Sequence, residues 1–166
     1  MRIIGIDPGS RKTGYGIVDY ERNRTVYVGS GCIQLGDKKP IESRLLLLSE
    51  QLDLIYQQYS PECGVVEKIF FGKNAQSALV LGHARGVILL KLAMWKLPVY
   101  EYTPLDIKKS VVGVGRATKD QVMHMVKILL NQKTHAMVED ESDALAVAIT
   151  HAHLIPFLQK KNDFLS

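Results

Sequence analysis

The sequence predicts an α/β domain in which helices flank a mixed five-stranded sheet. Three strand-like segments lie close together at the start of the chain, over residues 2–7, 13–21 and 25–35. From about residue 41 the apolar period changes from two to three or four, and helices then alternate with two short strands. Closely spaced strands favour an antiparallel meander, whereas strands joined by crossover helices are parallel, so both arrangements are expected in one sheet.

The middle of the chain alternates between helix and strand. An amphipathic helix is predicted from about residue 41 to 60, because leucines and an isoleucine recur there at steps of three and four. CGVVEKIF then predicts the fourth strand, residues 75–96 a long helix, and PVYEYTP the fifth strand.

The last third of the chain is predicted to be mainly helical. LDIKKSVVG indicates a short helix or a turn, and GVGRATK a flexible loop. Thr118 can N-cap a helix that continues to about Asn131, and residues 139–155 predict the last helix.

Size and composition fit one folded unit. The 166 residues are 46% hydrophobic and 23% charged, as in ordinary globular proteins, and no repeat or linker divides them. We therefore expect a single domain over residues 1–156, followed by a frayed polar tail at 157–166.

Composition also argues against several classes of protein. Cys32 and Cys63 lie far apart without the spacing of a zinc site, so buried reduced thiols are expected. The start of the chain lacks the pattern of a secretion signal, which favours a cytoplasmic location. The most apolar stretch, VILLKLAMW, is short and contains Lys91, so no membrane span is expected.

The helix predicted over residues 75–96 is apolar around most of its circumference. Packing against one sheet needs only one apolar stripe, so a second buried face is expected, most simply in a homodimer. Gly82 and Gly86 are four residues apart and would let another helix approach closely.

Two carboxylates stand at unusual places in the predicted strands. Asp7 ends the first strand just before Pro8 and Gly9, where an Asp commonly initiates a turn. Glu67 interrupts the apolar run CGVVEKIF, where both strand propensity and burial disfavour it. The alternatives for Glu67 are an exposed edge strand or an ion pair with Lys68 or Arg85.

Two further acids project from one side of the last helix. Asp140 and Asp143 are three residues apart, and the apolar segment after them predicts that this helix packs on the sheet. The attraction of acids to a helix N-terminus accounts for Glu139 and Glu141, and it accounts less well for Asp143.

A cluster of Asp7, Glu67, Asp140 and Asp143 would need a bound cation. Two like charges about 4 Å apart repel by about 4 kcal/mol at an effective dielectric near 20. Oxygen ligands without His or Cys favour Mg²⁺, with Mn²⁺ as a substitute. Two such ions about 4 Å apart can promote in-line hydrolysis of a phosphodiester.

Basic residues surround these acids in the predicted turns and element ends. The chain carries a formal net charge of +4, and long basic side chains at such places can converge on a phosphate backbone, although a solvated surface is the simpler alternative. The residues are Arg11, Lys12, Lys68, Lys73, Lys108, Lys109, Arg116 and Lys119.

Four ordered blocks together resemble the RuvC family of Holliday-junction resolvases. They are IGIDPGSRKTGYGI, VVEKIFFGKNAQSALVLGHARGV, VVGVGRATKDQV and ESDALAVAITHAH, and the similarity extends from residue 1 to about 156. The first block alone is not specific, because actin-like ATPases and sugar kinases begin with a similar strand and glycine turn.

The resemblance implies a fold, an activity and partners. It implies an RNase H-like fold, a homodimer and Mg²⁺-dependent paired nicking of four-way DNA junctions, with 5′-phosphate and 3′-hydroxyl ends. It also implies action in DNA recombination and repair with the branch-migration proteins RuvA and RuvB. In this reading Asp7, Glu67, Asp140 and Asp143 match the metal-binding acids of the family, and Glu139 or Glu141 is an alternative to Asp140.

The resemblance also implies DNA contacts. Phe70 matches an aromatic residue that stacks on bases at the crossover, with core packing as the alternative. Lys108 and Lys119 match basic positions near the scissile bond. Lys109, Lys73 and Arg116 are further expected DNA contacts, with solvation as the alternative.

Three other functions remain as alternatives. The chain could be an RNase H-like nuclease that acts on structured RNA, or a DNA-junction-binding module without catalysis. An ATP-dependent kinase or chaperone domain is disfavoured, because 166 residues leave no room for a second lobe around the nucleotide.

Overall fold

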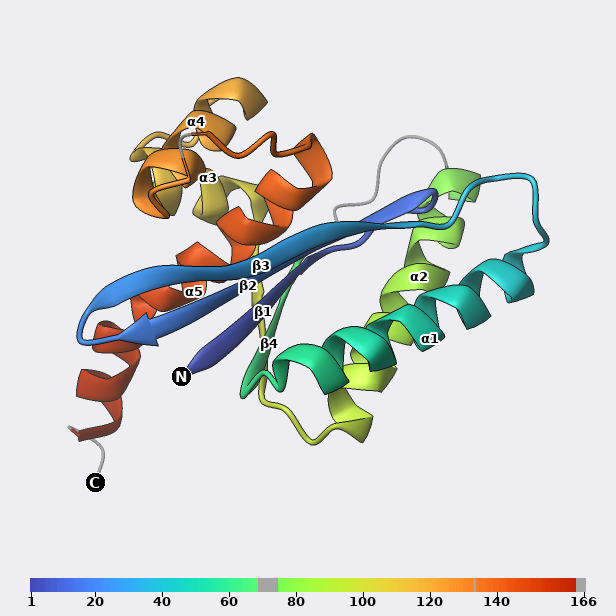
Figure 1. Ribbon diagram of the computed structural model, residues 1–166, viewed down its shortest axis with the longest axis horizontal. Helices are drawn as coiled ribbons and strands as arrows, with labels where there is room; N and C mark the ends of the chain where they lie inside the picture. The colour runs from blue at the N-terminus through green and yellow to red at the C-terminus, as the bar shows by residue number, and fades with distance from the viewer. Residues whose placement is uncertain (69–74, 133, 164–166) are drawn as a thin grey trace.

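In the computed structural model, which describes residues 1–68, 75–132 and 134–163, five strands form one twisted sheet (Figure 1). The strand order is β3-β2-β1-β4-β5. β1 pairs with β2 and β2 with β3 in antiparallel fashion, whereas β1, β4 and β5 are parallel, so the predicted mixed sheet is confirmed. The strands are β1 (Arg2–Asp7), β2 (Lys12–Glu21), β3 (Arg24–Gln34), β4 (Cys63–Glu67) and β5 (Val99–Tyr102).

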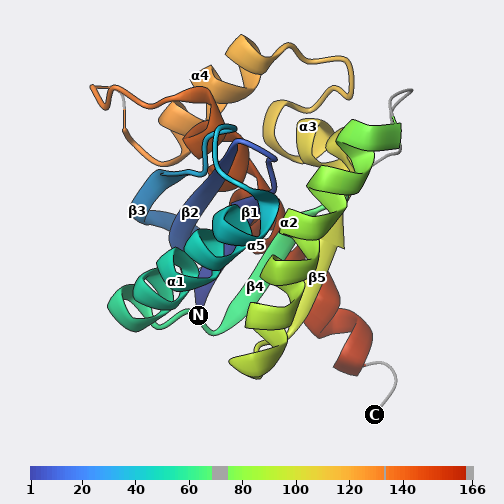
Figure 2. The same ribbon diagram turned by 90° about the vertical axis from the view of Figure 1, so that its right-hand side faces the viewer.

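Helices cover both faces of this sheet. α1 and α2 lie on one face and α5 crosses the other, with α3 and α4 packed against α5 (Figures 1 and 2). The helices are α1 (Ile41–Tyr59), α2 (Ala75–Met94), α3 (Pro104–Val112), α4 (Lys119–Leu129) and α5 (Glu139–Asp163).

Alternation along the strands divides the apolar core into two layers. Ile3 and Val65 belong to the cluster that includes α5, whereas Ile4 and Val66 belong to the cluster that includes α1 and α2. Successive strand residues point to opposite faces, and β1 is central, so both of its faces are buried. The apolar composition of β1 therefore follows from its place in the sheet.

Two glycines let α5 lie directly on the sheet. A Cβ atom on Gly5 would stand 2.2 Å from the carbonyl oxygen of Ala144, and one on Gly14 would stand 2.0 Å from that of Asp140. Neither distance is sterically possible, so any larger residue would push the helix away. The absence of these side chains brings the start of α5 to the end of β1.

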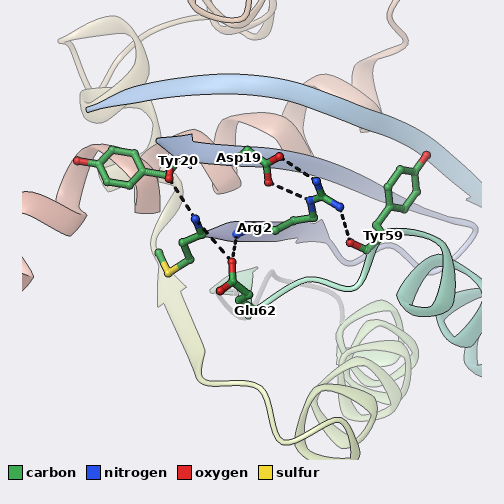
Figure 3. A network of polar contacts seen from close by, with 6 residues as sticks. Arg2, Asp19, Tyr20, Tyr59 and Glu62 are labelled. Atoms are coloured by element: carbon green, nitrogen blue, oxygen red, sulfur yellow. Dashed lines mark hydrogen bonds and ion pairs between the residues drawn. The ribbon is translucent and has the colours of Figure 1, made fainter. Parts of the chain in front are cut away.

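A polar network fixes the other end of β1 (Figure 3). The Arg2 guanidinium donates two hydrogen bonds of 2.9 Å to Asp19 on β2 and one of 2.9 Å to the carbonyl oxygen of Tyr59. The Glu62 carboxylate accepts the Arg2 backbone N–H at 2.5 Å. The hydrogen bonds from Arg2 lower the pKa of Asp19. Arg2 thereby joins β1, β2 and the end of α1.

Side-chain caps define the starts of α3 and α4. Thr103 and Asp106 form a capping box on α3, and Thr118 and Gln121 form one on α4. The predicted N-cap at Thr118 is confirmed, and the segment LDIKKSVVG lies in a true helix. The second box fixes the backbone at Lys119, a predicted DNA contact, which is the first residue of α4.

The last helix is longer than predicted. α5 continues through Pro156 to Asp163, whereas the sequence suggested an end at residue 155. A proline removes one backbone donor but does not always end a helix. Residues 157–163 are therefore helical, and the domain boundary at 156 stays a prediction.

α2 keeps much of its apolar surface exposed. Leu79 is 61% exposed, Leu90 59% and Met94 63%. Within the described residues, α2 is the one helix that is long and apolar enough to cross a membrane. The expectation that this stretch is too short is therefore wrong for the whole helix. Length and composition alone are weak evidence for a membrane span, because core helices of other proteins share them. Ion pairs from Arg85 to Glu101 on β5 and from Lys91 to Asp53 on α1 attach it to the domain.

Candidate active site

Three carboxylates meet where β1 and β4 end and α5 begins. Asp7 is the last residue of β1 and Glu67 the last of β4, and the parallel register pairs the residues before them, Ile6 and Val66. Asp143 comes from the first turns of α5, which lies on β1. These three acids, which the sequence placed in one cluster, line a single cavity of about 220 Å³.

The walls of this cavity are basic and apolar. Two lysines reach it from α3 and α4, and apolar side chains of both helices close the sides. The lining residues besides the acids are Pro104, Ile107, Lys108, Lys119 and Val122. The arrangement is a carboxylate floor beneath a positively charged rim, which suits a phosphate group above cations.

Burial and nearby charges disfavour ionisation of Asp7 and Glu67. Burial is the main cause that raises the pKa of Asp7 to about 8, and the charge of Glu67 and a hydrogen bond between the two carboxyl groups add to it. Burial also raises the pKa of Glu67, against the effect of that hydrogen bond. Without a cation, the folded protein therefore favours a state in which this pair of carboxyl groups holds a proton.

Lys119 provides the positive charge at Asp143. Its ammonium donates to Asp143 Oδ2 at 3.1 Å and to Glu139. Both carboxylates raise the pKa of Lys119, and burial raises the pKa of Asp143 in spite of the lysine. The Lys119 ammonium thus compensates part of the charge of the clustered acids.

Asp140 does not line the cavity with the other three acids. Its carboxylate lies near Cys32, where it adds to the effect of burial in raising the pKa of that thiol. A step of three residues separates two positions by about 60° around the helix axis, so Asp140 lies beside Gly14 of β2 and Cys32 of β3 while its neighbour Asp143 lines the cavity. A role for Asp140 as fourth ligand stays a prediction.

Glu141 points away from the cavity. Its carboxylate accepts the backbone N–H of Val138 at 3.1 Å and lies 3.9 Å from His135 Nε2. It therefore caps α5 and is not placed to substitute for Asp140. Glu139 contacts Lys119, and sequence reasoning had assigned it no such role. The four-residue spacing of Glu139 and Asp143 was the available signal, because such residues share a helix face.

The donor set of the cavity fits a hard divalent cation. Among the described residues, no three or more His, Cys, Asp or Glu side chains are arranged tightly enough to hold a metal as they stand. The acidic side chains that line the described cavity nevertheless offer carboxylate oxygens as metal ligands, and no thiol or imidazole lies among the lining residues. A divalent cation could take over the charge compensation that the shared proton and Lys119 provide.

The remaining predicted residues are distributed around this site. Lys109 is exposed on α3, and Arg116 is exposed in the segment between α3 and α4. Phe70 and Lys73 lie outside the described residues. The predicted alternative partner of Glu67, Arg85, is paired with Glu101 instead.

The two cysteines differ in exposure. Cys63 is buried, and burial raises the pKa of its thiol to about 12. Cys32 is partly exposed, so the expectation of two buried thiols is correct for Cys63 and wrong for Cys32. Cys32 is on β3, one of the two edge strands of the sheet, which explains its exposure.

Comparison with known proteins identifies the family. The sequence model of the RuvC family, described as crossover junction endodeoxyribonuclease RuvC, matches residues 3–151. RuvC of Citrifermentans bemidjiense is 52% identical over 153 residues, which cover 92% of this chain and 93% of that protein. RuvC of Syntrophotalea carbinolica is 50% identical over 92% of this chain and 94% of that protein.

Solved structures show the same fold. Thermus thermophilus RuvC in complex with a Holliday junction substrate is similar with a TM-score of 0.87 and 28% identity, covering 95% of this chain and 96% of that one. The yeast mitochondrial resolvase Ydc2 shares the fold at a TM-score of 0.71 and 14% identity, over 98% of this chain and 82% of that one. The sheet order and the family match therefore confirm the predicted RNase H-like architecture, and the chain belongs to the RuvC family of crossover junction endodeoxyribonucleases.

Proposed function

We propose that this chain resolves four-way DNA junctions by paired symmetric nicks that leave 5′-phosphate and 3′-hydroxyl ends, in homologous recombination and DNA repair. The observation that carries the proposal is the cavity in which Asp7, Glu67 and Asp143 converge beneath Lys108 and Lys119. The relatives are named crossover junction endodeoxyribonucleases, and one related RuvC was solved with a Holliday junction. Both points favour a junction over linear DNA as the substrate.

The proposed cofactor is Mg²⁺, with Mn²⁺ as a substitute and two ions for each active site. Asp7, Glu67 and Asp143 would hold them, and Asp140 would contribute from the side of β2. When bound, the ions supply stabilisation of the negative charge that develops on the phosphate and on the leaving oxygen. Oxygen-only donors support this choice.

The residues of the chain set up the reaction in three ways. Burial raises the pKa of Asp7, so Asp7 and Glu67 become fully anionic together only when a cation compensates their charge. The ammonium groups of Lys108 and Lys119 face the cavity and attract the phosphate. Ile107 and Val122 form apolar walls that limit the access of bulk water.

Further DNA contacts are proposed outside the cavity. Lys109 is exposed in the last turn of α3, and Arg116 is exposed in the segment after that helix. Phe70 and Lys73 come three and six residues after Glu67, so they are near the site along the chain. Basic contacts of this kind position a duplex without reading its sequence.

A homodimer is proposed through the exposed side of α2. Leu79, Leu90 and Met94 offer apolar area there, and Cβ atoms added to Gly82 or Gly86 would meet nothing within 4 Å. Two symmetric nicks require two active sites, which a twofold dimer supplies. RuvA and RuvB are proposed as partners in the cytoplasm, by analogy with the family name.

The test is nicking of an end-labelled four-way junction and of a linear duplex with the same arms, each with and without Mg²⁺. Paired symmetric nicks in the junction alone, dependent on Mg²⁺ and lost in Asp7→Asn, are expected. Asp120→Asn is the matched control, because Asp120 is exposed on α4 and does not line the cavity. Junction binding without any metal-dependent nicking would instead indicate an architectural module, and preferential cleavage of structured RNA would indicate a ribonuclease.

A further inference from the structure

Two helix starts bring one ammonium between two carboxylates at the rim of the cavity. Lys119 is the first residue of α4, and Glu139 and Asp143 lie four residues apart on α5. Residues at this spacing share a helix face. Lys119 Nζ donates to both of them.

The two carboxylates differ in their surroundings. The side chain of Glu139 is 56% exposed, whereas that of Asp143 is 22% exposed and lines the cavity with Asp7 and Glu67. Glu139 is absent from that lining. It thus contacts the lysine from the solvent side without reaching the place where a cation would be held.

The lysine has two possible effects on cation binding. An ammonium that pairs fully with Asp143 competes with any cation for the same oxygen atoms. An ammonium held at the rim leaves those oxygens available and remains close enough to attract a phosphate. The position of Lys119 between the two carboxylates therefore affects how easily Asp143 can bind metal.

We propose that Glu139 is a positioning residue that draws the Lys119 ammonium toward the rim, so that Asp143 can bind a divalent cation while the lysine stays beside the cavity. This inference rests on the proposed metal-dependent function. It assigns to Glu139 no direct contact with metal or DNA, and it distinguishes Glu139 from Asp140, whose side chain faces Cys32.

The capping box of α4 makes this positioning effective. Thr118 and Gln121 fix the first turn of α4, so the backbone of Lys119 is held and only its side chain needs to be placed. Lys119 is 61% exposed, so without Glu139 its flexible stem would be free to swing toward Asp143 or into solvent. Either movement would weaken the site.

The test compares Glu139→Gln, Lys119→Met and the double variant by the Ca²⁺ concentration that gives half of the maximal thermal stabilisation. Ca²⁺ serves as the probe so that binding is measured without DNA or turnover. We expect Glu139→Gln to raise this concentration about tenfold, and to change it less than about twofold when Lys119 is already Met, because coupled residues are not additive. Asp120→Asn removes a charge from the same turn of α4 without contacting the lysine, and a change of less than about twofold is expected there.

Three results decide the matter. An equal effect of Glu139→Gln with Lys119 present or replaced would overturn the proposal, since Glu139 would then act by charge alone. An effect equal to that of Asp120→Asn would overturn it for the same reason. If Ca²⁺ stabilises the wild type but the wild type nicks no junction, the proposed function fails. The comparison of the two single variants with the double variant still decides whether Glu139 acts through Lys119 in metal binding.

Discussion

Replacing Asp7 by Asn should make the metal-free protein more stable at alkaline pH while it abolishes activity. The pKa of Asp7 is raised from 3.8 to about 8 in the folded state, mainly by burial and by Glu67. Between these values the folded protein binds a proton that the unfolded chain has released. The contribution of Asp7 to the free energy of unfolding is therefore largest below about pH 4 and is lost as the pH rises to about 8.

The size of the effect follows from the same shift. Each pKa unit corresponds to about 1.4 kcal/mol, so a gap of about four units sets an upper bound of roughly 6 kcal/mol. Glu67 shares the proton and Lys119 offsets part of the charge, so about half of that bound, roughly 3 kcal/mol, is expected. Asn cannot ionise and has nearly the same shape, which removes this cost without leaving a cavity.

The assay is urea unfolding in EDTA at pH 5, 7 and 9, followed by the fluorescence of Trp95. This is the single tryptophan, and it stacks on Tyr56 with ring centroids 4.5 Å apart. Asp7→Asn should gain stability relative to wild type as the pH rises, and Asp120→Asn should not. Parallel stability profiles for wild type and Asp7→Asn would show that the carboxylates do not share a proton, and the charge argument for a cation would lose its basis.

Three further outcomes are expected. Gly5→Ala should destabilise the protein by about 3 kcal/mol in urea unfolding, because its Cβ would meet the carbonyl oxygen of Ala144 at 2.2 Å. A loss below about 1 kcal/mol would contradict the close packing of α5. Leu90→Glu should convert a dimer to a monomer in light scattering with little change in the monomer fold, since Leu90 is 59% exposed on α2. An unchanged molecular mass would place the dimer interface elsewhere. A thiol reagent at pH 8 should label Cys32 and leave Cys63 unmodified until the protein unfolds, because Cys63 is buried and its thiol has a raised pKa. Rapid labelling of both cysteines would contradict the burial of Cys63.

The sequence was sufficient to predict the sheet because local rules and topology agree along it. Short loops determine that β1, β2 and β3 form a meander, and the helix between β4 and β5 makes these strands parallel. The register between β1 and β4 then places Asp7 beside Glu67. The sequence did not reveal the β-bulge between Ile17 and Val18 or the continuation of α5 through Pro156. Both depend on packing against neighbouring elements rather than on local propensity.

The acidic segment at the start of α5 shows why the site could be predicted only in part. Glu139, Asp140, Glu141 and Asp143 are equally good candidates by residue type, and their different roles arise from the rotation of the helix on the sheet. Gly5 and Gly14 set that rotation, because α5 can approach only where no side chain intervenes. Asp143 lies at the ends of β1 and β4, Asp140 lies beside Gly14 and Cys32, and Glu139 contacts Lys119. The two glycines thus help to decide which of the four acids lines the cavity with Asp7 and Glu67.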